Sequence, residues 1–501
     1  MPPPSSLASS SLRKVSSLLS SQALSPPDLL SFCYSRAILG EETLALNNFA
    51  HLNSMDDLLP LAAESQRRYE LAEPLSALDG VPVAIKANFC RTNSLTTSAS
   101  SMLSNYRPPF TATAVSRLEA AGAIIMGSTN MDEFGMGSLT SSSVHGPSVS
   151  SLPYLPHLSP APPSAPPSVP RLSPGGSSGG SASSVALRSS FLSLGTDTGG
   201  SVRLPAAFCG VAGFKPGYGE ISRFGVIQYA SSLDTVGVFT PEAGDARLAY
   251  EVLRGGCKND ETSSSLFPSS PLPPPAPSLS SVKIGIPLAY SIDECLPAVK
   301  ASWASAASSL EAAGASLVHL GDDRMSEHAV QQSLAAYYVV ACAEAASNLS
   351  KYDGVRFGSR ERDPEASFFE EIENTRAKHF GKAVRERIAT GNEVLSKEGS
   401  HYQNANGVRG DVRDAFTRCF EVADVLVMPA QVGLPPEVGK GEEVSVGLAN
   451  DLMTCGVSLA GMPAIVVPVK GGQGIGVQLV ANVGNEGLLL DVATKLEELD
   501  F

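Results

Sequence analysis

Three separated segments of the chain carry residue types that could perform nucleophilic catalysis. They are Gly80–Lys86, which ends in a lysine, the glycine- and serine-rich Pro174–Ser181, and Gly195–Ser201. A serine hydroxyl needs a neighbouring base, and lysine can be that base only where burial lowers its pKa from about 10.4. Each segment alone is weak evidence, because glycine–serine runs are usually linkers and terminal lysines are usually solvated.

The glycine-rich segments lack the features of nucleotide-binding loops. A Walker-type loop requires Gly-Lys-Ser/Thr after its glycines, and neither segment supplies that lysine. A dinucleotide-binding G-x-G-x-x-G is also missing. We therefore expect no nucleotide site built from this chain's own motifs.

The composition narrows the classes of function. Acidic residues outnumber basic ones by 50 to 36, a net charge of -14, so any contact with RNA should come through a partner. The eight cysteines are scattered without a C-x-x-C pair, which predicts reduced thiols and no metal site. No run approaches the ~20 apolar residues that span a bilayer, so no membrane partner is expected.

Short apolar runs alternate with amphipathic stretches around the three segments. Residues 81–85 and 123–126 have the pattern of buried strands, and 113–121 that of the helix between them. The other predicted elements are a strand at 282–286, a helix at 301–313, a hairpin of 464–469 with 475–480, and a helix at 488–499. This order predicts a single large α/β domain with a mixed β-sheet core flanked by helices on both faces.

The N-terminus admits two interpretations. Residues 1–27 contain no Asp or Glu, are rich in Ser and carry two basic residues, the composition of a short organellar targeting segment. The alternative is a frayed polar terminus. Against a full-length targeting segment, the helical spacing of Leu12, Val15, Leu18 and Leu19 predicts the start of a first folded helix.

Two proline- and serine-rich segments interrupt the main domain, which we assign to residues 28–501. Proline removes a backbone donor, and small residues bury little surface. We therefore interpret 148–174 as a surface insertion and 263–281 as a linker.

Taken together, the ordered Lys86, Ser177 and Ser201, with Ser201 24 positions after Ser177, resemble the amidase signature family. The resemblance covers most of the chain and implies that fold. It implies that Ser201 attacks an amide carbonyl to form an acyl ester, while Ser177, preceded by a cis peptide bond, relays the proton to Lys86. Thr198, Gly199 and Gly200 would form the oxyanion hole.

The sequence departs from the family pattern at two places. Ala87 stands where the family usually has Asp after the lysine. The family's Gly-Pro-Thr-x-Asn-Pro stretch is replaced by Gly146–Ser148 and the proline-rich insertion.

Within this family, the chain is similar to the subfamily of A subunits of glutamyl-tRNA(Gln) amidotransferases. The similarity lies in Gly127–Gly137, Phe208–Pro216, Ser222–Gly225, Ser231–Gly237 and Ala343–Gly358. It implies that glutamine is the substrate, with Arg356 binding its α-carboxylate and Asp451 its ammonium group.

The same resemblance implies a larger complex. Ammonia would pass to partner subunits B and C, or an organellar equivalent, which bind Glu-tRNA(Gln) and use ATP with Mg to form Gln-tRNA(Gln). This chain itself would bind no cofactor. We interpret its setting as mitochondrial translation, with a plastid or the cytoplasm as alternatives.

Two rival functions remain open at the level of sequence. A general amidase acting on other small amides would keep Lys86, Ser177 and Ser201 without using Arg356 or Asp451. A non-catalytic assembly subunit would carry a vestigial signature. Without the resemblance, Arg356 would be interpreted as part of a surface salt bridge and Asp451 as a helix cap.

Overall fold

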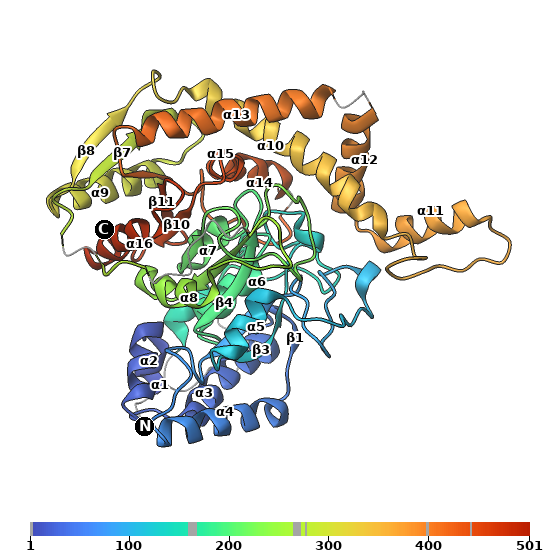
Figure 1. Cartoon of the computed structure of the whole chain (residues 1–501), viewed down its shortest axis with the longest axis horizontal. Helices are drawn as coiled ribbons and strands as arrows, with labels where there is room; N and C mark the ends of the chain where they lie inside the picture. Colours follow the sequence, from blue (N-terminus) through green and yellow to red (C-terminus); the bar gives the residue numbers. More distant parts are fainter. Residues whose placement is uncertain (1–3, 159–167, 264–271, 276–277, 397–399, 441–442) are drawn as a thin grey trace.

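One mixed β-sheet forms the centre of the molecule. The computed structural model describes residues 4–158, 168–263, 272–275, 278–396, 400–440 and 443–501 (Figure 1). The sheet has 11 strands in the order β1-β3-β2-β4-β6-β5-β10-β11-β9-β7-β8. The strands are β1 (Phe49–Leu52), β2 (Pro82–Lys86), β3 (Ile124–Thr129), β4 (Leu192–Asp197), β5 (Ala212–Lys215), β6 (Thr235–Thr240), β7 (Lys283–Pro287), β8 (Ser316–Leu320), β9 (Val425–Pro429), β10 (Ala464–Pro468) and β11 (Gly476–Ala481).

Helices cover both faces of this sheet. Gly213 of β5 lies against Ala206 of α7 (Arg203–Cys209) and Val202 just before it, whereas its neighbour Phe214 stacks edge-on with Tyr250 of α8 (Ala246–Leu253). Consecutive strand residues point to opposite faces, so α7 and α8 lie on opposite sides. The predicted mixed sheet flanked by helices is confirmed.

The helices gather into recognisable groups in Figure 1, where α10 and α13 run along one end, α2 to α4 lie near the N-terminus and α11 projects outward. Among the described residues no helix is long and apolar enough to cross a bilayer. The helices are α1 (Pro4–Ala8), α2 (Leu12–Ser20), α3 (Pro26–Ile38), α4 (Met55–Glu70), α5 (Thr113–Ala120), α6 (Gly179–Leu187), α7 (Arg203–Cys209), α8 (Ala246–Leu253), α9 (Pro297–Ala312), α10 (Glu327–Asn348), α11 (Phe368–His379), α12 (Lys382–Ser396), α13 (Ser400–Phe420), α14 (Glu443–Asp451), α15 (Cys455–Leu459) and α16 (Glu486–Glu498).

The N-terminal segment contains a folded helix, as its leucine spacing predicted. Leu12, Val15 and Leu19 of α2 are fully buried in the main core. The Asp245 carboxylate accepts hydrogen bonds from the backbone N–H groups of Leu12 at 2.8 Å and Arg13 at 2.9 Å. This satisfies two of the donors that a helix start leaves unpaired.

The interpretation of 148–174 as a surface insertion is wrong for its N-terminal part. Val149 and Tyr154 are buried in a core cluster, and the Ser151 N–H and hydroxyl bond to Ser183 of α6. Paired hydroxyls allow small polar residues to be buried at little cost. Residues 159–167, the middle of this segment, lie outside the described residues.

The sheet places the predicted chemical residues at one edge. Strands β2 and β4 are parallel neighbours, with Ile85 paired with Leu194. Because parallel strands end at the same edge of a sheet, Lys86 and the segment after Asp197 emerge side by side. The loop before α6 joins them there.

Candidate active site

Lys86 is the last residue of β2 and its side chain is fully buried. Its Nζ donates to the Ser177 Oγ at 2.8 Å, the Thr196 Oγ1 at 2.9 Å and the Thr196 carbonyl at 3.4 Å. Burial lowers the pKa of Lys86 to about 7, although the charges of buried aspartates oppose that shift. Near neutral pH, a large fraction of this amine is therefore uncharged and able to accept a proton.

Ser177 lies in the loop that leads into α6. The Gly176–Ser177 peptide bond is cis, as the family resemblance implies. A side chain at Gly176 would collide with the Asp132 carboxylate and with the backbone of Ser138 and Leu139. Glycine is needed here for the close approach of two backbone segments.

Ser201 lies in the turn between β4 and α7. The residue is 8% exposed, and its hydroxyl forms no hydrogen bond with the residues that the structure describes. The loop around it is anchored by a buried ion pair, in which Arg203 contacts the Asp197 carboxylate at 2.8 Å, and by the Val202 N–H, which donates to the same carboxylate. Although burial alone would raise it, the Arg203 charge holds the pKa of Asp197 below its usual value.

The three residues before Ser201 are each in close contact with a side chain from another part of the fold. The Thr198 hydroxyl donates to Asp234 at 2.7 Å. A Cβ at Gly199 would collide with the ring of Tyr337, and one at Gly200 with Thr454. The backbone of this segment is therefore fixed in position, as an oxyanion hole requires.

Asp451, at the end of α14, lies next to this segment. Its buried carboxylate accepts from the Tyr338 hydroxyl at 2.7 Å and from the Ser138 hydroxyl at 3.2 Å. Burial raises the pKa of Asp451 to about 6. Because Tyr338 directly follows Tyr337, which covers Gly199, helix α10 places this carboxylate close to the predicted oxyanion hole.

Arg356 is not brought into contact with the other predicted residues. Its side chain is 63% exposed and pairs with Asp353 at 2.8 Å. This is the surface salt bridge that its charge alone would favour. Its role toward glutamine stays a prediction.

Several residues of this cluster carried no clear sequence signal. Thr196 lies within the Gly195–Ser201 segment, but its contact with Lys86 depends on the register of β2 and β4. Tyr337, Tyr338 and Thr454 come from helical segments distant in sequence from the serine loops. Only the three-dimensional packing reveals them.

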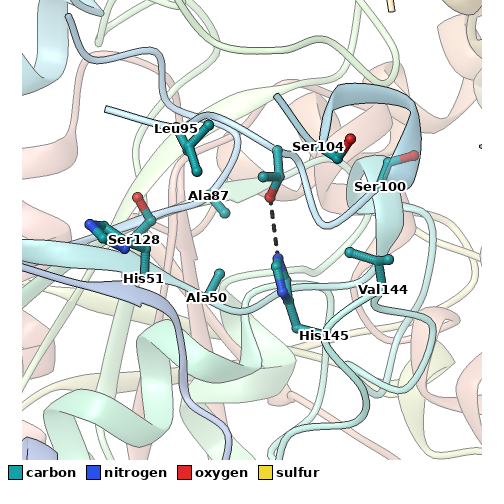
Figure 2. Close-up of a pocket in the computed structure, with 10 residues that line it drawn as sticks. Ala50, His51, Ala87, Leu95, Ser100, Ser104, Ser128, Val144 and His145 are labelled. Atoms are coloured by element: carbon teal, nitrogen blue, oxygen red, sulfur yellow. Dashed lines mark hydrogen bonds between the residues drawn. The ribbon is translucent and has the colours of Figure 1, made fainter. Parts of the chain in front are cut away.

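A small pocket lies beside Ala87, the residue that follows β2 (Figure 2). Its volume is about 230 Å³, and His51, Ala87, Thr97 and His145 are among the residues that line it. The His145 Nε2 lies 3.4 Å from the Thr97 Oγ1, and Figure 2 shows the His145 ring among the residues that line the pocket. Ala87 follows Lys86 directly, in the turn after β2, and is one of the residues that line this pocket. An aspartate at this position, usual in the family, would therefore add a carboxylate to the lining of the pocket.

The fold and the buried pair of Lys86 and Ser177 define the class of protein: the chain belongs to the amidase family, which matches residues 28–490. More particularly, it is similar to the A subunit of the glutamyl-tRNA(Gln) amidotransferase of Synechococcus sp. (strain WH7803), 40% identical over 438 residues that span 85% of this chain and 84% of the relative. It is 36% identical over 523 residues to the chloroplastic/mitochondrial A subunit of Arabidopsis thaliana, spanning 96% and 91%.

A solved structure agrees with these relatives. The crystal structure of the glutamyl-tRNA(Gln) amidotransferase A subunit from Thermotoga maritima superposes with a TM-score of 0.76 and 27% identity, covering 98% of this chain and 95% of that chain. The similarity to this subfamily, expected from the motifs, is thereby confirmed.

Proposed function

We propose that this chain is the glutamine-hydrolysing A subunit of a glutamyl-tRNA(Gln) amidotransferase. The observation that carries the proposal is the hydrogen bond of 2.8 Å between the buried Lys86 amine, whose pKa is lowered to about 7, and Ser177. A base of this pKa next to a serine relay is suited to activating a second serine at neutral pH.

The reaction follows from the order of the three groups. The Ser201 Oγ bonds to the side-chain carbonyl carbon of glutamine, its proton passes to Ser177, and the Ser177 proton passes to Lys86. The proton taken up by Lys86 returns through Ser177 to the leaving nitrogen as the carbon–nitrogen bond breaks. This releases ammonia and leaves a glutamyl ester on Ser201. Water, deprotonated by the same pair, then cleaves the ester to glutamate and restores Ser201.

The backbone around Thr198, Gly199 and Gly200 would stabilise the negative charge that develops on the substrate carbonyl oxygen. Its N–H groups are proposed to bind the oxyanion, and its rigid anchoring avoids reorganisation during the reaction. This would contribute several kcal/mol of transition-state stabilisation, about 10²–10³ in rate for each donor.

Recognition of free glutamine is assigned to two charged residues. Asp451, ionised above pH about 6, would bind the ammonium group. Arg356 would exchange Asp353 for the α-carboxylate of the substrate. That exchange costs little, because an exposed ion pair contributes about 0–1 kcal/mol.

Ammonia from this site would be used by partner subunits of types B and C, or an organellar equivalent, which bind Glu-tRNA(Gln) and consume ATP with Mg. The acidic balance of this chain, -14 in net charge, supports leaving tRNA binding to a partner. The cofactor-free chemistry of Lys86, Ser177 and Ser201 supports placing ATP there as well.

We place the complex in mitochondrial translation. The proposal rests on the Ser-rich, acid-free N-terminus and on the chloroplastic/mitochondrial relative. Fusing residues 1–27 to a fluorescent protein tests this localisation without deleting α2 from the full chain. Mitochondrial signal is expected, whereas plastid or diffuse signal would overturn the choice.

Substrate profiling tests the proposed activity. The purified chain, alone and with B and C subunits, is assayed for ammonia and glutamate release and for Gln-tRNA(Gln) formation, beside Ser201→Ala. We expect that glutamine hydrolysis depends on Ser201 and is coupled to the formation of Gln-tRNA(Gln). Turnover of aliphatic amides undiminished by Arg356→Ala, without glutamine hydrolysis, would indicate a general amidase. An unchanged rate in Ser201→Ala would indicate a non-catalytic subunit.

A further inference from the structure

Thr454 contacts the loop before Ser201 from outside the serine segments. It lies between α14 and α15 and is buried. Its hydroxyl donates to the Gly199 carbonyl at 2.5 Å. The same oxygen is the atom nearest to the position that a Cβ at Gly200 would take. Thr454 is thus packed against both residues of the Gly199–Gly200 peptide.

The orientation of this peptide decides where one N–H group points. The Gly199–Gly200 peptide is trans, and in a trans peptide the C=O and N–H bonds point in opposite directions. Because Thr454 holds the Gly199 carbonyl on its own side, the Gly200 N–H is directed to the other side.

We propose that Thr454 is a positioning residue that orients the Gly200 N–H toward the carbonyl oxygen of the substrate. This inference rests on the proposed function, because it assigns an oxyanion role to that N–H. Within the part of the chain that the structure describes, Thr454 forms no hydrogen bond with Lys86 or Ser177. It therefore acts through the peptide that it holds.

The support behind Thr454 is rigid. Its carbonyl accepts from the Arg203 Nη1 at 3.0 Å, and Arg203 is paired with Asp197 in a fully buried ion pair. Asp197 in turn accepts from the Val202 N–H on the far side of Ser201. The two flanks of the nucleophile loop are therefore tied to one charged network, and Thr454 is its contact with Gly199.

The same residue connects the oxyanion segment to the predicted ammonium site. The Thr454 N–H donates to the Asp451 carbonyl at 3.1 Å. Asp451 and Thr454 thus share one turn of chain. If Asp451 binds the ammonium group of the substrate, it also fixes where the side-chain carbonyl oxygen of the substrate lies relative to the Gly200 N–H.

The test is steady-state kinetics of Thr454→Val and Thr454→Ser in the full chain reconstituted with its partner subunits. Valine keeps the shape and removes the hydroxyl, whereas serine keeps the hydroxyl. Removing one oxyanion donor costs about 10²–10³ in kcat, so misorienting one should lower kcat about 10–100-fold in Thr454→Val. KM should change less than about 2-fold, and Thr454→Ser should restore kcat to within about 3-fold of wild type.

Thr494→Val is the matched control, because the Thr494 hydroxyl also donates to a backbone carbonyl, that of Leu490 in α16, away from the serine loops. It should leave both constants unchanged. If Thr454→Val does not fold, Thr454→Ala replaces it, with the same expected decrease in kcat and the same small change in KM. A kcat within about 2-fold of wild type in the folded variant, a change confined to KM, or equal impairment in Thr454→Ser would overturn the proposal.

Failure of this inference is distinguishable from failure of the proposed function. If wild type hydrolyses glutamine and Thr454→Val matches it, only the role of Thr454 falls. If wild type hydrolyses other amides instead, the glutamine assignment falls. The same kcat and KM comparison is then made on the amide that is turned over, because an oxyanion forms in the hydrolysis of any amide.

Discussion

At the scale of single residues, the chemistry depends on the environment of one amine. Lys86 was predicted from its order with Ser177 and Ser201 and from the family resemblance, and the structure buries it against Ser177 and Thr196. The order of Lys86, Ser177 and Ser201 is visible in the sequence because glycine-rich loops leave a recognisable pattern. Thr196 and Thr454 leave none, since ordinary threonines become informative only through their contacts.

The pKa of Lys86, about 7, predicts the pH dependence of turnover. Only the uncharged amine accepts a proton, so kcat should fall as pH decreases through about 7 and approach a plateau at higher pH. Lys86→Met should lower kcat at least about 10³-fold at every pH.

The control for this pH profile is a second buried lysine. Lys215, in β5, donates to the Pro216 carbonyl, and burial lowers its pKa to about 7 as well. Lys215→Met, if folded, should keep the decrease of kcat as pH falls through about 7. If that decrease disappears in this variant, its assignment to Lys86 is contradicted.

The Asp451 carboxylate predicts a separate pH effect on substrate affinity. Burial raises its pKa to about 6, and protonation removes the negative charge that the ammonium group needs. KM for glutamine should therefore rise as pH falls through about 6 and approach a constant value at higher pH. Asp451→Asn should raise KM about 10-fold or more at pH 7.5. A KM that stays constant down to pH 5 would exclude Asp451 from this role.

At the scale of elements, the parallel pairing of β2 and β4 brings the lysine and the nucleophile loop to one edge. The strands and helices predicted from the sequence were found with ends shifted by a few residues, as for the C-terminal helix Glu486–Glu498. The buried part of 148–174 was missed because serine and proline indicate a loop, whereas here serine hydroxyls pair with α6. Such pairing depends on distant chain segments and has no local signature.

The Asp197–Arg203 ion pair predicts a stability effect at this scale. Both side chains are fully buried, and removing one partner of a buried pair costs about 3–5 kcal/mol. Arg203→Ala should lower the free energy of unfolding by that amount in urea denaturation. Arg324→Ala removes the partly exposed pair with Glu421 and should cost less than about 1 kcal/mol. Equal effects of the two substitutions would contradict the anchoring role of the network.

At the scale of the whole molecule, the described N-terminal segment is part of the core. The sequence allowed a targeting segment or a folded helix over 1–27, and periodicity alone could not choose, because an amphipathic helix serves both purposes. The burial of α2 against the main core decides that residues 12–20 fold with the domain.

Deletion of residues 1–27 tests this packing. It removes three fully buried side chains, Leu12, Val15 and Leu19, each contributing about 1.5–3 kcal/mol. The shortened chain should melt at a clearly lower temperature than a chain lacking only residues 1–10, which retains α2. Identical melting temperatures for the two deletions would show that α2 contributes nothing to stability.

The central claim is that Ser201 carries the acyl group of glutamine while Lys86 and Ser177 move its proton. The most direct measurement is acid quenching of the chain during turnover of isotopically labelled glutamine, followed by mass spectrometry of the serine-containing peptides. We predict a labelled glutamyl ester on Ser201, absent in Ser201→Ala and absent from Ser177 and Ser178. Label on Ser177 or Ser178, or labelling that persists in Ser201→Ala, would contradict the assignment of Ser201 as the nucleophile.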